Sequence, residues 1–148
     1  MAYSVYTDLE ALVGVPTLAQ LTNDTPGATT TDQTVAAAMI AQADILIDSK
    51  AGQVYTVPFT GTVPDQIKLI SRNLALYFCF CRRFAIMEVP KQWVDIKADM
   101  DSLLDDISNM MRWLPGATPI ASTEGDMQTM TDDPSFDFTN EDNPVSFF

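Results

Sequence analysis

Five aspartates lie within one segment of the sequence, close enough together to suggest a carboxylate site. They are Asp95, Asp99, Asp101, Asp105 and Asp106. Clustered carboxylates bind divalent cations or form the acid–base pair of glycoside hydrolases. The segment contains no glycine-punctuated calcium loop, and a helix in a small bundle offers no obvious cleft for a sugar. We therefore expect the aspartates to cover a solvated helix face, where they act together as an electrostatic field and hold no metal ion.

Histidine is absent from the sequence. Its absence removes the commonest general base, the commonest metal ligand and every Ser-His or Cys-His nucleophile pair. Serines and threonines are numerous, but no base is placed to activate one of them. Nothing resembles a glycine-rich phosphate-binding loop. We expect no catalytic residue and no cofactor, and hence a protein that is not an enzyme.

The two cysteines, Cys79 and Cys81, are separated by one residue. This spacing does not match a Cys-x-x-Cys motif and cannot form a disulfide framework. On a helix, residues two apart point about 200° away from each other, so the two thiols cannot bind one metal ion. We expect reduced cysteines packed in a helix, as in a protein assembled in a cytoplasm.

Arg82 and Arg83 form the only adjacent basic pair, directly after the most apolar stretch of the sequence. One interpretation is structural: the pair neutralises nearby carboxylates and the negative end of its own helix. The other is functional, with the pair forming a docking point for an acidic segment of another chain. Both interpretations are open at this point.

The composition is typical of an acidic folded domain. The 148 residues are 47% hydrophobic and carry a net charge of −12, from 20 acidic and 8 basic side chains. This apolar share is enough for a buried core, whereas the acidic surface repels the phosphates of nucleic acids. No stretch reaches the roughly 18 apolar residues of a membrane span, and the N-terminus lacks the pattern of a signal peptide. We expect neither DNA binding through a basic patch nor contact with a membrane.

The N-terminal part of the chain contains signals for two short helical elements. Thr7 and Glu10 have the spacing of a capping box, and Gly14 is placed to end the element that they begin. A second short turn is predicted over residues 16–21. Both elements present leucines at helical spacing, so we expect them to pack on the same core.

Three longer helices are predicted after these. The first is capped by Thr31 or Asp32. The second begins at Pro64 and carries apolar residues on two sides, which predicts a central position. The third begins after Pro90 and continues its apolar spacing to Met111. The pattern predicts an all-α fold, a small bundle of about four helices over residues 1–118, in which the last two helices form an antiparallel hairpin.

The remaining residues, 119–148, have a different character. They include seven acidic residues, no basic residue and no helical period. They also hold four of the eight phenylalanines of the chain: Phe136, Phe138, Phe147 and Phe148. We expect an extended C-terminal arm that is disordered alone and whose phenylalanines anchor on a partner protein. The alternative is a flexible, solubilising terminus.

Several short segments occur in an order that matches a known family. They are residues 6–9 (YTDL) with Leu12 and Gly14, residues 18–22 (LAQLT), residues 35–55 with Ile47-Asp48-Ser49 before Gly52 and Tyr55, the prolines Pro58 and Pro64, and residues 93–111. The ordered set resembles the small helical head-completion, or head–tail adaptor, proteins of tailed bacteriophages, in particular the Mu-like family. The similarity covers residues 1 to about 118, and the acidic arm is unlike the short C-termini usual in that family.

The resemblance implies a structural virion protein at the head–tail junction, assembled in the host cytoplasm. It implies a ring, commonly of twelve copies, that docks beneath the capsid portal protein, contacts a neighbouring tail or connector protein and continues the DNA channel. Asp95, Asp99 and Asp106 are then candidates to face the channel, through which DNA passes without specific binding. Arg82, Arg83 and the phenylalanines of the arm are candidates to bind partner proteins. The alternative function is that of an acidic binding module, such as a DNA mimic that inhibits a nucleic-acid-binding protein.

Overall fold

The computed structural model describes residues 1–84 and 88–120, and within them the chain is helical. The elements are α1 (Tyr6–Val13), α2 (Val15–Thr22), α3 (Gln33–Ala51), α4 (Asp65–Arg83) and α5 (Lys91–Ser108). The prediction of an all-α bundle is confirmed. The described residues contain five helices in place of about four, because each short N-terminal turn extends to a helix of eight residues.

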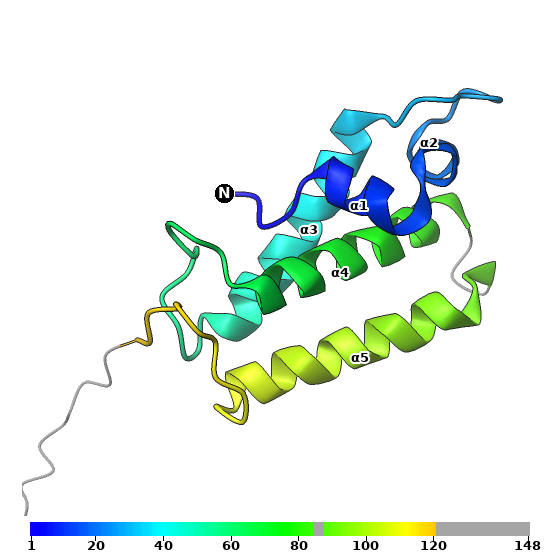
Figure 1. The fold of residues 1–148 in the computed structure, drawn as a ribbon. Coiled ribbons are helices and arrows are strands. Elements are labelled where there is room, and N and C mark those ends of the chain that lie inside the picture. Colours follow the sequence, from blue (N-terminus) through cyan, green and yellow to red (C-terminus); the bar gives the residue numbers. More distant parts are fainter. Residues whose placement is uncertain (85–87, 121–148) are drawn as a thin grey trace, which may run out of the picture.

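Helix α4 occupies the centre of the bundle, as predicted. It packs against each of the other four helices, and its fully buried side chains include Ile67, Leu74 and Leu76. Helix α5 runs back along α4, α3 crosses α4 on another side, and α1 and α2 cover the remaining part (Figure 1). A helix with apolar residues on two sides requires neighbours on both, and the topology provides them.

Helix α3 begins at the predicted N-cap. The carboxylate of Asp32 accepts hydrogen bonds from the backbone N–H groups of Thr34 and Val35, at 2.9 and 3.2 Å. These bonds satisfy two of the donors that a helix N-terminus leaves free. Ala36, Ala43 and Ala51 are fully buried, so small side chains allow the backbone of α3 to approach its neighbours closely.

The predicted capping box at Thr7 is wrong. Helix α1 begins at Tyr6, and the carboxylate of Asp8 accepts from the backbone N–H of Val5 at 2.9 Å. Glu10 instead accepts a hydrogen bond from the hydroxyl of Thr31 at 2.6 Å. The helix starts earlier than predicted because the residues before it are hydrogen-bonded to the bundle, a tertiary constraint that local spacing does not carry.

The end of α5 also differs from the prediction. The helix ends at Ser108, and Met110 has a positive φ of 58°. Met110 and Met111, predicted to continue the apolar stripe, are 71% and 82% exposed. The chain turns here so that Leu114 becomes fully buried, with its backbone N–H donating to the hydroxyl of Tyr55 at 3.2 Å.

The last described residues pair with the loop after α3. The N–H of Thr56 donates to the carbonyl oxygen of Thr118 at 2.9 Å. The N–H of Ile120 donates to the carbonyl oxygen of Val54 at 2.8 Å. The predicted division between a helical domain (residues 1–118) and an arm (residues 119–148) stays a prediction. The hydrogen bonds to the loop after α3 extend two residues beyond it, to Ile120. Phe136, Phe138, Phe147 and Phe148 lie outside the described residues. In the described part of the chain, each helix is too short or too polar to cross a bilayer.

Candidate interaction surfaces

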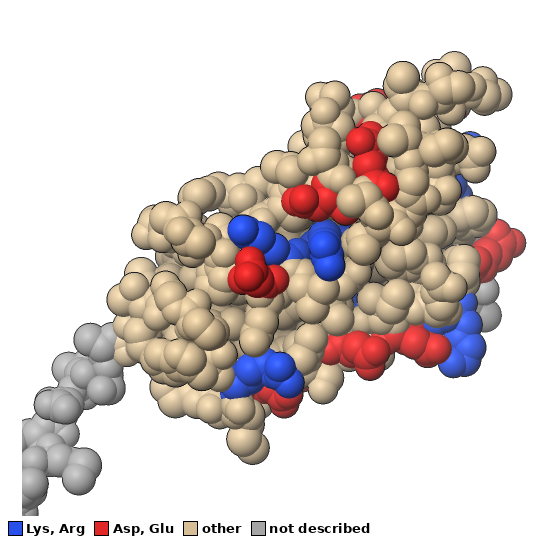
Figure 2. Space-filling model, in the orientation of Figure 1, with Lys and Arg blue, Asp and Glu red and all other residues tan. Residues whose placement is uncertain are grey.

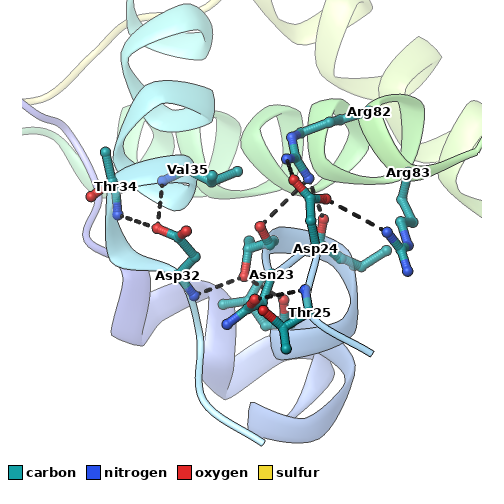
Figure 3. Close-up of polar contacts among 11 residues, drawn as sticks. Asn23, Asp24, Thr25, Asp32, Thr34, Val35, Arg82 and Arg83 are labelled. Carbon is teal, nitrogen blue, oxygen red and sulfur yellow. Dashed lines mark hydrogen bonds and ion pairs between the residues drawn. The ribbon is translucent and has the colours of Figure 1, made fainter. Parts of the chain in front are cut away.

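Three charged residues meet where α2 and α4 end, and we call this place the α2–α4 corner. Asp24 comes from the loop after α2, while Arg82 and Arg83 occupy the last turn of α4. Arg82 Nη2 lies 2.6 Å from Asp24 Oδ2, and Arg83 Nη1 lies 3.6 Å from Asp24 Oδ1 (Figure 3). The hydrogen bond from Arg82 lowers the pKa of the Asp24 carboxyl. Two guanidinium groups thus share one carboxylate.

The loop after α2 is held in a shape that places Asp24 at this corner. The side-chain oxygen of Asn23 accepts from the N–H of Thr25 at 3.0 Å, and the hydroxyl of Thr22 accepts from the N–H of Asp32 at 3.1 Å (Figure 3). The first is a local turn of the kind that asparagine favours. The second ties the end of α2 to the start of α3.

The two arginines differ in their surroundings. Arg82 Nη1 lies 3.4 and 3.5 Å from the carbonyl oxygens of Leu21 and Thr22, at the negative end of α2. Its side chain is 29% exposed, against 44% for Arg83. Arg82 therefore has a structural role: it pairs with Asp24 and neutralises the negative end of α2 as well as that of its own helix, α4. Docking of an acidic segment stays a prediction, for which Arg83 is the more accessible residue.

A hollow of about 330 Å³ adjoins the corner, and both polar and apolar side chains line it. Its lining residues are Thr17, Gln20, Leu21, Gly27, Phe80, Arg83 and Phe84. The ring of Phe80 stacks between Phe84 and Trp93, with centroid separations of 6.2 and 5.0 Å. Phe84 is 39% exposed. The sequence analysis missed these aromatic walls, although a phenylalanine directly after the arginine pair was a visible signal.

The aspartates of α5 are mostly paired with lysines. Asp95 Oδ2 lies 2.7 Å from Lys91 Nζ, and Asp105 Oδ1 lies 2.7 Å from Lys50 Nζ of α3; Asp101 pairs with Lys97. On the face drawn in Figure 2, acidic groups accordingly lie near basic ones, with wide uncharged areas between them. In residues 1–84 and 88–120, no three cysteine, aspartate or glutamate side chains are arranged to hold a metal ion.

The three aspartates predicted to face a channel share one side of α5. Asp95, Asp99 and Asp106 are four and seven residues apart, so successive members differ by about 40° or less around the helix axis. Asp95 belongs to an ion pair, Asp99 is exposed and Asp106 is half-buried at the end of the helix. Their alignment is compatible with one wall, and the channel itself stays a prediction.

A buried polar cluster, which the sequence analysis missed, joins the N-terminus to α3 and α4. Its members are Tyr3, Ser4, Asp44 and Ser71, each at most 6% exposed. The Asp44 carboxylate accepts from the Ser71 hydroxyl at 2.6 Å and from the N–H of Tyr3 at 2.9 Å. Because the Ser71 hydroxyl donates its hydrogen to Asp44, it acts as the acceptor for the Ser4 hydroxyl, 2.8 Å away.

The surroundings of this cluster raise the pKa values of two of its groups. Burial raises the pKa of the Asp44 carboxyl. Burial and the hydrogen bond to Asp48 raise the pKa of the Tyr3 phenol, whose oxygen also accepts from the N–H of Phe59 at 3.2 Å. The polar atoms of this cluster find their partners inside the chain, so its role is structural.

Two apolar surfaces remain exposed on the body. A groove of about 420 Å³, here the α3 groove, lies between the N-terminal segment and the outer face of α3. Among its lining residues, Met1, Val5 and Ile45 are 73%, 53% and 70% exposed. The second, here called the C-terminal apolar patch, is the set of exposed apolar side chains after α5: Met110, Met111, Trp113 and Ile120, between 46% and 82% exposed.

A known protein family matches most of the chain. The family model described as bacteriophage Mu, Gp36 matches residues 3–131. The chain belongs to this bacteriophage family. No curated protein matches the sequence. The predicted resemblance to Mu-like phage proteins is thus confirmed at the level of the family, and the match extends past residue 118, where the resemblance was expected to end.

The family match includes the surfaces described above but ends before the phenylalanines of the predicted arm. All five helices, the α2–α4 corner and both apolar surfaces lie inside residues 3–131, apart from Met1 and Ala2 of the α3 groove. The four phenylalanines of the predicted arm lie beyond residue 131. The Gp36 family therefore covers the helical body, and the phenylalanine-bearing end of this phage protein follows it.

Proposed function

We propose that this member of the Gp36 family is a structural virion protein that connects the capsid portal to the tail. In this function copies of the chain form a ring, of twelve in the arrangement common among the adaptor proteins it resembles, and the ring continues the DNA channel. The observation that carries the proposal is the family match over residues 3–131, which includes every described helix. Its partners are the portal protein and a neighbouring tail or connector protein.

The exposed apolar surfaces support self-association. Contiguous exposed apolar residues commonly mark protein–protein contacts. A ring requires two different, complementary surfaces on each subunit, because each copy contacts its two neighbours in a head-to-tail manner. The α3 groove is concave and the C-terminal apolar patch is built from different elements, so the body offers two different apolar surfaces for these contacts.

The charge of the chain supports passage of DNA without specific binding. A net charge of −12 keeps phosphates away from the surface as a whole. The side of α5 that carries Asp95, Asp99 and Asp106 is the proposed wall of the channel. These carboxylates repel the DNA phosphates, and the function requires no contact with the bases.

A mass measurement separates this function from that of an acidic binding module. Sedimentation of the full chain, alone and with portal particles, should give a large symmetric assembly or comigration with the portal. A DNA mimic should instead remain a monomer or dimer and bind a nucleic-acid-binding protein. Monomeric behaviour in both samples would contradict the connector function.

A further inference from the structure

We infer that the α2–α4 corner and its hollow bind residues 132–138 of a second copy of this chain. The acidic, phenylalanine-bearing segment (DDPSFDF) of one subunit then docks beside Arg83 of its neighbour. This inference rests on the self-association in the proposed function and names the surface and the segment that carry it.

Charge complementarity is the first ground. At the corner, Arg82 and Arg83 share the single carboxylate of Asp24. An arginine side chain has five N–H donors, and that of Arg83, 44% exposed with its nearest contact to Asp24 at 3.6 Å, keeps donors available. Residues 132–138 bring three carboxylates and no cation. Opposite charges of this kind favour encounter and set register.

The aromatic hollow is the second ground. Aromatic rings pack favourably with centroids about 4.5–7 Å apart, and the stack of Trp93, Phe80 and Phe84 already follows this spacing. The outer member, Phe84, is 39% exposed. Phe136 or Phe138 of an incoming segment can extend the stack, while Asp137 between them lies within reach of the guanidinium at the rim. One short segment thus supplies a carboxylate for the guanidinium and an aromatic ring for the hollow.

The position of the last described residues favours a second copy as the source. Ile120 pairs with Val54, and the nearby Pro115 and Gly116 line a surface with Pro64 and Asp65, at the start of α4. The corner lies at the other end of this 19-residue helix, about 28 Å away at 1.5 Å per residue.

Within one copy, the twelve residue steps from Ile120 to Asp132 would have to bridge this distance, out of at most about 40 Å at 3.3 Å per residue. A flexible chain of that length has a typical end-to-end distance of only about 20 Å, so the link would have to be stretched. An intramolecular path beside α5 would also run along its five aspartates. A neighbouring corner placed near Ile120 removes both difficulties.

Photocrosslinking in the full chain tests the inference. Phe138→p-benzoylphenylalanine should crosslink to the hollow of another copy, giving dimers and larger species whose linked peptides contain residues 17–27 or 80–84. The same photoreactive residue at Met127, outside the docking segment, is the matched control for position. Links confined to a single copy, links to other surfaces or an absence of links would each overturn the inference.

A charge reversal gives the second part of the test. Arg83→Glu should reduce the crosslinked fraction by about fivefold or more, since one favourable contact becomes a repulsive one. Lys68→Glu makes the same change in charge at an exposed residue near the start of α4, at the other end of that helix from the corner, and should leave the fraction unchanged. Circular dichroism of both variants checks that the helices are intact. Equal crosslinking in the two variants would contradict docking at the corner.

The outcomes distinguish this inference from the proposed function. Crosslinks to the hollow between copies, without binding to portal particles, would support the inference and contradict the connector function. Portal binding by the Arg83→Glu variant at the level of the unmodified chain, with no crosslink to the hollow, would support the function and contradict the inference.

Discussion

The buried polar cluster and the α2–α4 corner both tie distant parts of the chain together, but they do so in opposite ways. In the cluster, the Asp44 carboxylate is almost inaccessible and receives hydrogen bonds from Ser71 and Tyr3. At the corner, Asp24 is shared by two arginines and faces solvent. The first arrangement is satisfied within one chain, whereas the second leaves the Arg83 side chain 44% exposed. The comparison teaches that one aspartate stabilises the fold through buried hydrogen bonds, whereas another lies in an exposed ion-pair network that we infer to be a docking surface.

The largest effect on stability is expected from Asp44→Ala. The substitution leaves the Ser71 hydroxyl and the Tyr3 N–H buried without their acceptor, which should lower the free energy of unfolding by about 2–3 kcal/mol. Urea denaturation followed by circular dichroism measures this. Asp95→Ala on the surface of α5 is the control, with an expected change within about 0.5 kcal/mol. Equal losses in the two variants would remove the distinction between buried and exposed carboxylates.

A smaller effect is expected from Arg82→Ala. This side chain contacts Asp24 and the carbonyl end of α2, and losing these partly exposed contacts should cost about 1 kcal/mol. Arg83→Ala serves as the matched comparison, because Arg83 is more exposed and its contact is longer; its cost should stay within about 0.5 kcal/mol. A greater loss from Arg83 than from Arg82 would reverse their assigned roles.

The two carboxylates should respond to pH with opposite signs. Burial raises the pKa of Asp44, so its contribution to stability is complete below the unfolded pKa of about 3.9 and is lost as the pH rises through the folded pKa. The pKa of Asp24 is lowered by Arg82, so its contribution is present above about pH 3.9 and is lost as the pH falls through the folded pKa.

Denaturation of Asp44→Asn and Asp24→Asn between about pH 3 and 7 measures this difference. As the pH falls, the unmodified chain should gain stability relative to Asp44→Asn and lose it relative to Asp24→Asn. The same sign for both variants would show that the two sites do not differ in the way described.

The smallest effect on folding is expected from removal of residues 121–148. The cut follows Ile120, which keeps its hydrogen bond to Val54, so the free energy of unfolding should change by no more than about 0.5 kcal/mol. Without the docking segment, the apolar surfaces of the body alone should not hold the copies together, so association with portal particles or between copies should nevertheless be lost. Replacing Phe136, Phe138, Phe147 and Phe148 by alanine, with every acid kept, should have the same effect on association. Normal association of both variants would leave a solubilising terminus as the only role of these residues.

Local signals predicted much of the fold. Asp32 as an N-cap, Pro64 and Pro90 at helix starts and the apolar sides of α4 all act within a few residues of the chain, so they can be recognised in the sequence. Spacing alone misplaced the start of α1 and the end of α5. Both boundaries depend on tertiary contacts, through Tyr3 at one end and Leu114 at the other.

The surfaces were only partly predictable, for a related reason. Arg82 and Arg83 were visible as a pair, but their common partner, Asp24, lies far away in the sequence and its approach depends on the shape of the loop after α2. Asp44 and Ser71 likewise belong to different helices, with nothing local to connect them. Ile45 is 70% exposed, and the groove that it lines exists only because the N-terminal segment packs beside α3.

Negative-stain imaging of portal particles mixed with the full chain tests the connector function most directly. The account predicts added ring-shaped density at the portal, coaxial with the DNA channel, and its loss with the chain that ends at Ile120. Portal particles that look the same with and without the full chain, while the chain itself remains monomeric, would contradict it.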